Sequence, residues 1–204
     1  MNQSFAFIIA WPETHVRKVD TWYDPIMTSL GFCNDNYYKV GHAAIVLIDG
    51  ETGKPHYFDF GRYQTPKGKG RVRDASSDKD LVLHSIINYE NGIPQLEEMI
   101  CELNSNAACQ GSGLLRGGLH KINFYKAYDM AKSMQLNGTI PYGPFVVNGT
   151  NCARFVRTIA MSGSTSLIQM SKLLIAPMIT PTPMWNVRAV GEYRLCSESV
   201  VINF

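Results

Sequence analysis

Two short, unbroken apolar runs place the strongest constraint on the fold of this chain. Residues 5–11 (FAFIIAW) and 39–49 (KVGHAAIVLID) are apolar at successive positions, which predicts strands buried on both faces of a sheet. Neither run approaches the ~20 apolar residues that a membrane-spanning helix needs. The aromatic-rich run 56–63 (HYFDFGRY) follows a turn sequence at 49–53, so the second and third runs predict a β-hairpin.

The remaining apolar residues recur mostly at helical spacing. Segments 94–104, 124–135 and 151–163 each carry an apolar stripe that predicts an amphipathic helix. Strands and helices do not alternate regularly, which favours an α+β fold with a central, mainly antiparallel sheet packed against helices. The other predicted elements are a short helix opening at Asp24-Pro25, strands at 81–87, 144–147 and 192–204, and a covering loop between Thr158 and Trp185.

Composition narrows the class of protein. The 204 residues are 45% hydrophobic, and 19 Lys and Arg against 17 Asp and Glu give a net charge of +2. A single domain spanning residues 1–204 is therefore expected, with no nucleic-acid partner and no stable membrane association. Neither a basic region before 5–11 nor a small-residue cleavage site after it is present, so we expect no signal peptide and a cytoplasmic location.

The cysteines and histidines have no spacing typical of a metal site. Five cysteines, an odd number, lie at positions 33, 101, 109, 152 and 196 without a Cys-x-x-Cys pair. Reduced thiols are expected rather than a disulfide framework, and neither a metal nor a cofactor is predicted.

One of these cysteines has the surroundings of a nucleophile. Thr150 is a plausible N-cap, which places Cys152 in the first turn of the helix at 151–163. The helix dipole and the outward N–H groups there favour a thiolate and would stabilise a developing oxyanion. The alternative is a buried structural cysteine.

His42 is the one polar ring in the run 39–49. A buried imidazole needs a partner, and a backbone carbonyl within the core would be an ordinary one. Its neighbours Gly41, Ala43 and Ala44 are small, however, and leave room for the Cys152 helix to approach. A thiol–imidazole pair commonly has a third group that orients the ring.

The register of the predicted hairpin decides which residue that third group is. If paired residues have numbers whose sum is odd, as with His42 opposite Asp59, the two side chains share a face. An even sum would place His56 and Phe58 there instead. Asp59 is the preferred candidate, and His56 is the alternative.

Several segments resemble a known family. Gly41-His42-Ala43-Ala44-Ile45-Val46-Leu47, Tyr57-Phe58-Asp59 and Asn151-Cys152-Ala153-Arg154-Phe155-Val156 resemble the circularly permuted NlpC-type branch of the papain-like cysteine hydrolases, in which the histidine precedes the cysteine. That branch includes YiiX-like bacterial proteins and the lecithin:retinol acyltransferase group. Segments 11–14 and 58–63 are similar to a bacterial subgroup of it.

The resemblance implies roles for individual residues. It implies a papain-like fold with Cys152 as the nucleophile, His42 as the general base and Asp59 as the polar third residue. We expect Trp11, Glu13, Tyr38 and Asn151 to contact the substrate, although core or surface packing is the more common role of aromatic side chains.

Three functions follow from these residues. The leading one is a cysteine peptidase or amidase that acts on a small peptide or acyl-containing substrate through a Cys152 thioester. A lipid acyltransferase or phospholipase would use the same dyad, but Ala153 and Arg154 replace the Glu-His usual after the acyltransferase cysteine. A non-catalytic binding protein is the third. The basic stretch 62–73 is interpreted as a solvated loop whose positive charge would attract an anionic substrate at the edge of the cleft.

Overall fold

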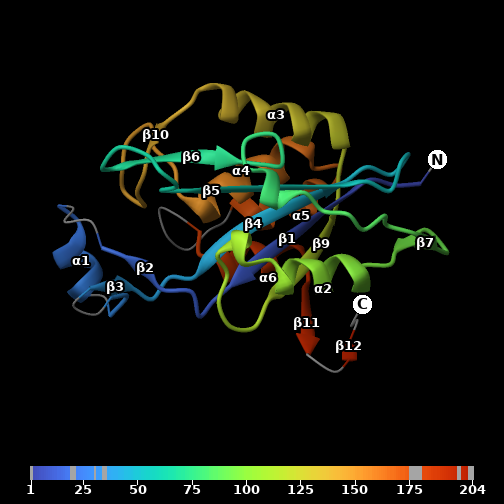
Figure 1. Ribbon diagram of the computed structural model, residues 1–204, viewed down its shortest axis with the longest axis horizontal. Coiled ribbons are helices and arrows are strands. Elements are labelled where there is room, and N and C mark those ends of the chain that lie inside the picture. Colours follow the sequence, from blue (N-terminus) through green and yellow to red (C-terminus); the bar gives the residue numbers. More distant parts are fainter. Residues whose placement is uncertain are drawn as a thin grey trace.

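One eight-stranded sheet forms the centre of the protein (Figure 1). The structure is a computed structural model that describes residues 2–18, 22–29, 31–33, 36–174, 181–196 and 199–201, with 192–196 and 199–201 as backbone alone. The strand order is β10-β6-β5-β4-β1-β9-β11-β12. These strands are β1 (Phe5–Trp11), β4 (His42–Ile48), β5 (Pro55–Gly61), β6 (Lys69–Arg73), β9 (Arg116–Lys121), β10 (Ile140–Pro141), β11 (Glu192–Cys196) and β12 (Ser199–Val201).

The sheet is antiparallel at each of its described pairings, so the predicted α+β class is confirmed. All seven residues of β1 and all seven of β4 are buried, as the two apolar runs predict. Two small two-stranded sheets lie outside the main sheet. They pair β2 (Val16–Arg17) with β3 (Tyr37–Tyr38) and β7 (Tyr89–Glu90) with β8 (Ile93–Pro94).

Helices cover the sheet on both sides. Four of them, α3 (Phe124–Leu136), α4 (Cys152–Gly163), α5 (Leu167–Leu174) and α6 (Pro183–Val190), pack against the face that carries Ala43, Ile45 and Leu47 of β4. The helix α2 (Glu97–Ser105) packs against the opposite face, with Ala44, Val46 and Ile48. The remaining elements are α1 (Asp24–Ser29) and the one-turn helices η1 (Lys79–Leu81) and η2 (Ala107–Cys109).

The hairpin register has the predicted parity. Ala44 pairs with Asp59, two positions along the strand from the His42–Asp59 pairing used in the prediction, and the sum of paired numbers is odd throughout. His42 and Asp59 therefore share a face. The even register is wrong, and His56 lies instead against the Phe124 and Tyr128 rings of α3, each with its centroid 5.4 Å away.

Two predicted strands are absent from the part of the chain that the structure describes. Residues 81–87 are irregular because their backbone finds other partners: the N–H groups of His84 and Ser85 donate to the Glu102 carboxylate of α2. Residues 144–147 form turns, and the Arg154 guanidinium binds the carbonyl oxygen of Pro144.

Two predicted loops are regular structure. The segment 158–185 contains α5 and the start of α6, which begins where the Thr182 hydroxyl accepts from the N–H of Trp185. The end of the basic stretch is the strand β6, because it pairs with β5 through Asp59 opposite Arg73. The predicted strand at 192–204 is confirmed for β11 and β12, while residues 197–198 and 202–204 lie outside the described residues.

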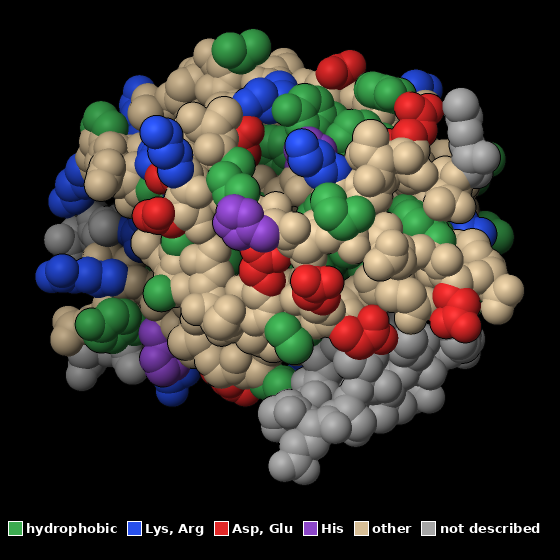
Figure 2. All heavy atoms as spheres, turned by 45° about the vertical axis from the view of Figure 1, so that its right-hand side comes forward, with side chains coloured by type: hydrophobic (Ala, Val, Ile, Leu, Met, Phe, Trp, Pro, Cys, Tyr) green, Lys and Arg blue, Asp and Glu red, His purple; other side chains and the backbone are tan. Residues whose placement is uncertain are grey.

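No described helix has both the length and the apolar character to span a membrane. On the face shown in Figure 2, acidic and basic side chains both occur, in keeping with the nearly balanced charge of the sequence.

Candidate active site

The site begins at the first residue of β4. His42 is 7% exposed, and its Nε2 lies 3.4 Å from Oδ2 of Asp59 on the neighbouring strand β5. The indole of Trp11 stacks on the imidazole, with the ring centroids 5.9 Å apart and the planes 14° apart. The ring of His42 is therefore held between a flat apolar surface and a carboxylate.

Asp59 is fully buried and, besides His42, has four donors around it. The Arg73 guanidinium, directly opposite on β6, donates from Nε to Oδ1 at 3.0 Å and from Nη2 to Oδ2 at 2.6 Å. The hydroxyls of Tyr57 and Tyr63 donate to Oδ2 at 3.1 and 2.9 Å. Burial raises the pKa of Asp59, but the hydrogen bonds and charges of His42 and Arg73 outweigh it, so the pKa is lowered and the carboxylate stays ionised.

Sequence reasoning missed Arg73 and Tyr63. Arg73 was assigned to a solvated loop, yet it is 4% exposed, and its guanidinium carbon lies 3.4 Å from the centroid of the Tyr63 ring. The sequence did contain an indication of this pair. A buried Asp59 carboxylate needs a cationic partner, and the nearest cationic residues in the sequence are those of the stretch 62–73.

Cys152 is the first residue of α4 and is 6% exposed. The N-cap is Asn151 rather than the predicted Thr150: its side-chain oxygen accepts from the N–H of Arg154 at 2.8 Å. The shift of one residue arises because Asn151 has the extended backbone of a cap, with φ of −138° and ψ of 177°. The thiol thus lies in the first helical turn, as predicted.

The Cys152 side chain adjoins both His42 and Tyr142, since its hydrogen bonding and charge contribute to the pKa of each. Burial lowers the pKa of His42, but the hydrogen bonds and charges of Asp59 and Cys152 raise it overall to about 9. Because Nε2 faces Asp59, Nδ1 is the nitrogen left for the thiol. The structure therefore brings together the three residues predicted as catalytic.

Tyr142, which follows β10, is a further residue that the sequence did not indicate. Its ring stacks on Phe60, with centroids 5.7 Å apart, and the Arg62 guanidinium lies 5.3 Å from its centroid. Burial and the charge of Cys152 raise the pKa of the Tyr142 phenol well above its usual range. The hydroxyl therefore remains a hydrogen-bond donor beside the thiol at neutral pH.

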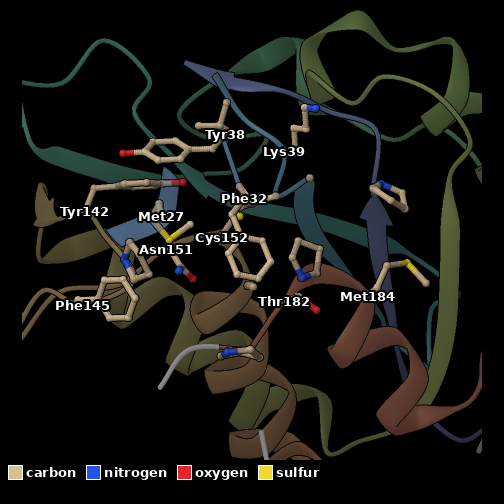
Figure 3. A pocket seen from close by; sticks show the side chains of 18 of the residues that line it. Met27, Phe32, Tyr38, Lys39, Tyr142, Phe145, Asn151, Cys152, Thr182 and Met184 are labelled. Atoms are coloured by element: carbon tan, nitrogen blue, oxygen red, sulfur yellow. The ribbon is translucent and has the colours of Figure 1, made fainter. Parts of the chain in front are cut away.

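Two cavities meet at this point. A groove of about 270 Å³ is lined by Cys152, and a cleft of about 420 Å³ is lined by His42. Figure 3 shows the groove with the Cys152 sulfur near its middle, Tyr142 and Phe145 to one side and Met184 to the other.

The residues predicted to contact substrate have different surroundings. Tyr38 and Asn151 line the groove. Trp11 is 3% exposed and lies against the imidazole of His42. The Glu13 carboxylate accepts from the N–H of Leu114 at 2.8 Å.

Among the described residues, no group of three or more His, Cys, Asp or Glu side chains is placed to hold a metal ion. The described cysteines, Cys33, Cys101, Cys109 and Cys152, are free thiols, while Cys196 lies outside the described side chains.

Comparison with known proteins yields two matches. Residues 6–168 match the model of the family described as type VI secretion system effector TseH-like. The crystal structure of the type VI secretion system effector TseH superposes with a TM-score of 0.65 at 19% identity, over 98% of this chain and 97% of that one. At this identity the superposition shows a shared fold. No curated protein matches the chain.

Proposed function

The chain belongs to the type VI secretion system effector TseH-like family, and from this premise we propose that it is a secreted effector that hydrolyses an amide or ester bond through a Cys152 thioester. The observation that carries the proposal is the meeting of Cys152, at the start of a helix, with a buried imidazole held by a carboxylate. The resemblance of segments 41–47 and 151–156 to NlpC-type papain-like hydrolases supports the same chemistry.

The first half of the reaction forms the thioester. In the resting pair the thiol proton resides on His42, whose raised pKa favours the imidazolium, and the Cys152 thiolate sulfur attacks the carbonyl carbon of the substrate. The tetrahedral intermediate collapses when the imidazolium returns this proton to the leaving nitrogen or oxygen, which departs as an amine or alcohol.

The second half regenerates the enzyme. His42 takes a proton from a water molecule, the resulting hydroxide attacks the thioester carbon, and the carbon–sulfur bond breaks to release a carboxylic acid and the thiol. Asp59 keeps the imidazole in one orientation in both halves. Because the carboxylate also binds Arg73, it acts as a fixed anchor and not as a proton acceptor.

The negative charge on the substrate oxygen needs donors. The N–H groups of Arg154 and Phe155 bond to Asn151, which leaves the N–H groups at the very start of α4, those of Cys152 and Ala153, for the substrate. The Tyr142 hydroxyl, next to the Cys152 thiol, is a second donor.

A lipid acyltransferase or phospholipase is the second candidate. The lipid alternative needs an apolar entrance, which the sequence did not indicate, and the groove at Cys152 supplies one through side chains such as Met27, Phe32 and Phe145. This observation favours an apolar acyl group, in a hydrolase as much as in a transferase.

Secretion is part of the proposal. The sequence predicts a cytoplasmic location, whereas membership of an effector family favours action after export from the producing cell. A fusion of the full chain to a small tag, followed in the medium of a strain with and without its secretion apparatus, measures this directly.

Cysteine alkylation against pH tests the catalytic pair. Cys101 is exposed and Cys152 is 6% exposed, so accessibility alone predicts that Cys101 reacts faster with iodoacetamide. The proposal predicts the reverse below pH 7, with the Cys152 rate falling at least ~10-fold in His42→Ala, since an activated thiolate reacts faster than a thiol. If Cys152 is alkylated no faster than Cys33, the protein is better explained as a non-catalytic binding protein.

Turnover then separates the two enzymatic candidates. The purified chain is offered thioester lipids and γ-linked peptides, with Cys152→Ser as the control for each. A Cys152-dependent free acid from a peptide supports the hydrolase, and transfer of the acyl group to an added amine or alcohol supports the transferase.

A further inference from the structure

A tyrosine hydroxyl lies beside both the imidazole and the carboxylate of the candidate site. Tyr63 follows the strand β5, and its Oη is 3.3 Å from Nε2 of His42 and 2.9 Å from Oδ2 of Asp59. The direct distance from Nε2 to Oδ2 is 3.4 Å. Nε2 therefore has two oxygen neighbours at nearly the same distance, and these two oxygens are bonded to each other.

The number of hydrogens decides which group donates in each of these contacts. Burial and the charge of Asp59 raise the pKa of the Tyr63 phenol well above its usual range, so the phenol keeps its one hydrogen at neutral pH. Tyr63 donates that hydrogen to the ionised Asp59 and can only accept from His42. Nε2 must therefore carry a hydrogen, and in the neutral imidazole the lone pair is on Nδ1, the nitrogen left for the Cys152 thiol.

Several contacts hold the Tyr63 ring in place. The Arg73 guanidinium carbon lies 3.4 Å from the ring centroid, and the same guanidinium binds Asp59. A Cβ at Gly61 would lie 2.5 Å from Cε2 of the ring, so the ring rests directly on the glycine backbone. The carbonyl oxygen of Tyr63 accepts from Nε of Arg71 at 2.9 Å. The position of the hydroxyl is thus fixed by ring and backbone together.

A second tyrosine offers a comparison within the same site. The Tyr57 hydroxyl donates to the same carboxylate oxygen, Oδ2 of Asp59, at 3.1 Å. Tyr57 packs in the layer that contains α2, and of the two hydroxyls only that of Tyr63 has a bond to His42 among the described residues. Both tyrosines stabilise the carboxylate, whereas Tyr63 also restrains the imidazole.

We propose that Tyr63 is a positioning residue for His42: its hydroxyl accepts from Nε2–H, donates to Asp59, and so keeps Nδ1 directed at the Cys152 sulfur. This role rests on the proposed function, because it concerns the imidazole that serves the thioester chemistry. When His42 is an imidazolium, its Nε2–H is a stronger donor, and the Tyr63 oxygen shares it with Oδ2. Tyr63 transfers no proton, since the proton that moves in the reaction is the one on Nδ1.

Removal of the hydroxyl alone tests this role. Tyr63→Phe keeps the ring on Arg73 and Gly61, so it should fold, and urea unfolding checks this. We expect alkylation by iodoacetamide at pH 7, followed at Cys152 by mass spectrometry, to slow about 10-fold because a hydrogen bond to the charged imidazolium is lost.

Two matched variants remove a hydroxyl elsewhere. Tyr57→Phe takes a donor from Asp59 without touching His42, so the alkylation rate at Cys152 should change less than ~3-fold. Tyr125 is 61% exposed and lines neither cavity, so Tyr125→Phe should leave the rate as in the wild type.

A positioning residue must act through the group that it positions. In a His42→Ala background, Tyr63→Phe should therefore leave the residual alkylation rate of Cys152 unchanged. A purely structural effect of the substitution would instead lower the rate by the same factor in both backgrounds.

The state of the imidazole can also be observed directly. In protein with 15N-labelled histidine, the ring signals that disappear in His42→Ala report which nitrogen of His42 carries the hydrogen. We expect the neutral wild-type ring to be the Nε2–H form, and the titration midpoint in Tyr63→Phe to be about 1 pH unit lower, with both tautomers present. Tyr57→Phe should retain the Nε2–H form.

The outcomes separate the positioning role from the proposed function. Equal effects of Tyr63→Phe and Tyr57→Phe on alkylation and on the His42 tautomer would overturn the positioning role and leave the thiol hydrolase standing. The same follows if Tyr63→Phe slows alkylation equally with and without His42. If His42→Ala itself does not slow alkylation of Cys152, the proposed function is removed and the positioning role with it.

Discussion

The stability of the folded protein should depend on the protonation of His42. In the native state its pKa is raised from the ordinary 6.5 to about 9, because the favourable interactions with Asp59 and Cys152 exceed the effect of burial. At about 1.36 kcal/mol per pKa unit, this difference amounts to roughly 3 kcal/mol of folding free energy.

The direction of the effect follows from the sign of the change. The folded state binds the proton more tightly than the unfolded chain does, so this contribution is complete below pH 6.5. It is lost as the pH rises through 9. We expect the free energy of unfolding of the wild type, measured in urea at pH 6, 7, 8 and 9, to fall relative to that of His42→Gln by about 3 kcal/mol across this range.

A second variant assigns the cause. Cys152→Ser removes the sulfur's share of the interaction and leaves that of Asp59, so its pH-dependent loss relative to a His42→Gln/Cys152→Ser double variant should be smaller than in the wild type. A difference between wild type and His42→Gln that is flat from pH 6 to 9 would refute the reasoning, since it would mean that the imidazole titrates alike in both states.

Three further changes test the surroundings of the site. Asp59→Ala leaves the buried Arg73 cation without its carboxylate and should cost about 3–5 kcal/mol in urea unfolding, whereas Arg73→Met/Asp59→Leu should recover much of that loss. Asn151→Ala removes the cap of α4 and should lower stability by about 1 kcal/mol, with a Ser replacement at the same position as the near-neutral control. Gly111→Ala would place a Cβ 2.2 Å from the Trp11 ring, so the ring must move, and alkylation of Cys152 should slow; Gly92→Ala, at a left-handed turn that lines neither cavity, should leave alkylation unchanged.

The meeting of His42, Asp59 and Cys152 could be predicted because these residues leave local marks on the sequence. His42 is a single polar ring in an apolar strand, and Cys152 follows a capping residue at the start of a helix. The face shared by His42 and Asp59 follows from the parity of one hairpin; the sequence left Asp59 and His56 as alternatives there, and the observed register selects Asp59. Each of these is information held within a few consecutive residues.

The partners of Asp59 could not be predicted in the same way. Arg73 reaches it from a third strand, and whether a basic stretch forms a strand or a solvated loop depends on what lies beside it. The same holds for the segment 81–87, whose strand-like composition is overridden by the Glu102 carboxylate of a distant helix. Tertiary hydrogen bonds decided both outcomes.

The small residues beside His42 were expected to leave room for the Cys152 helix, and only one of the three faces that helix. Ala43 does face the Cys152 helix, but Ala44 faces the opposite layer with Trp11, and Gly41 has a left-handed φ of 75°. A Cβ at Gly41 would lie 2.8 Å from the Trp11 carbonyl oxygen, so the glycine is required by the approach of β1 and not by that of α4. Side chains from both layers therefore lie against His42. The Cys152 thiol comes from the layer that contains α4, and the Trp11 indole, which stacks on the imidazole, comes from the opposite layer.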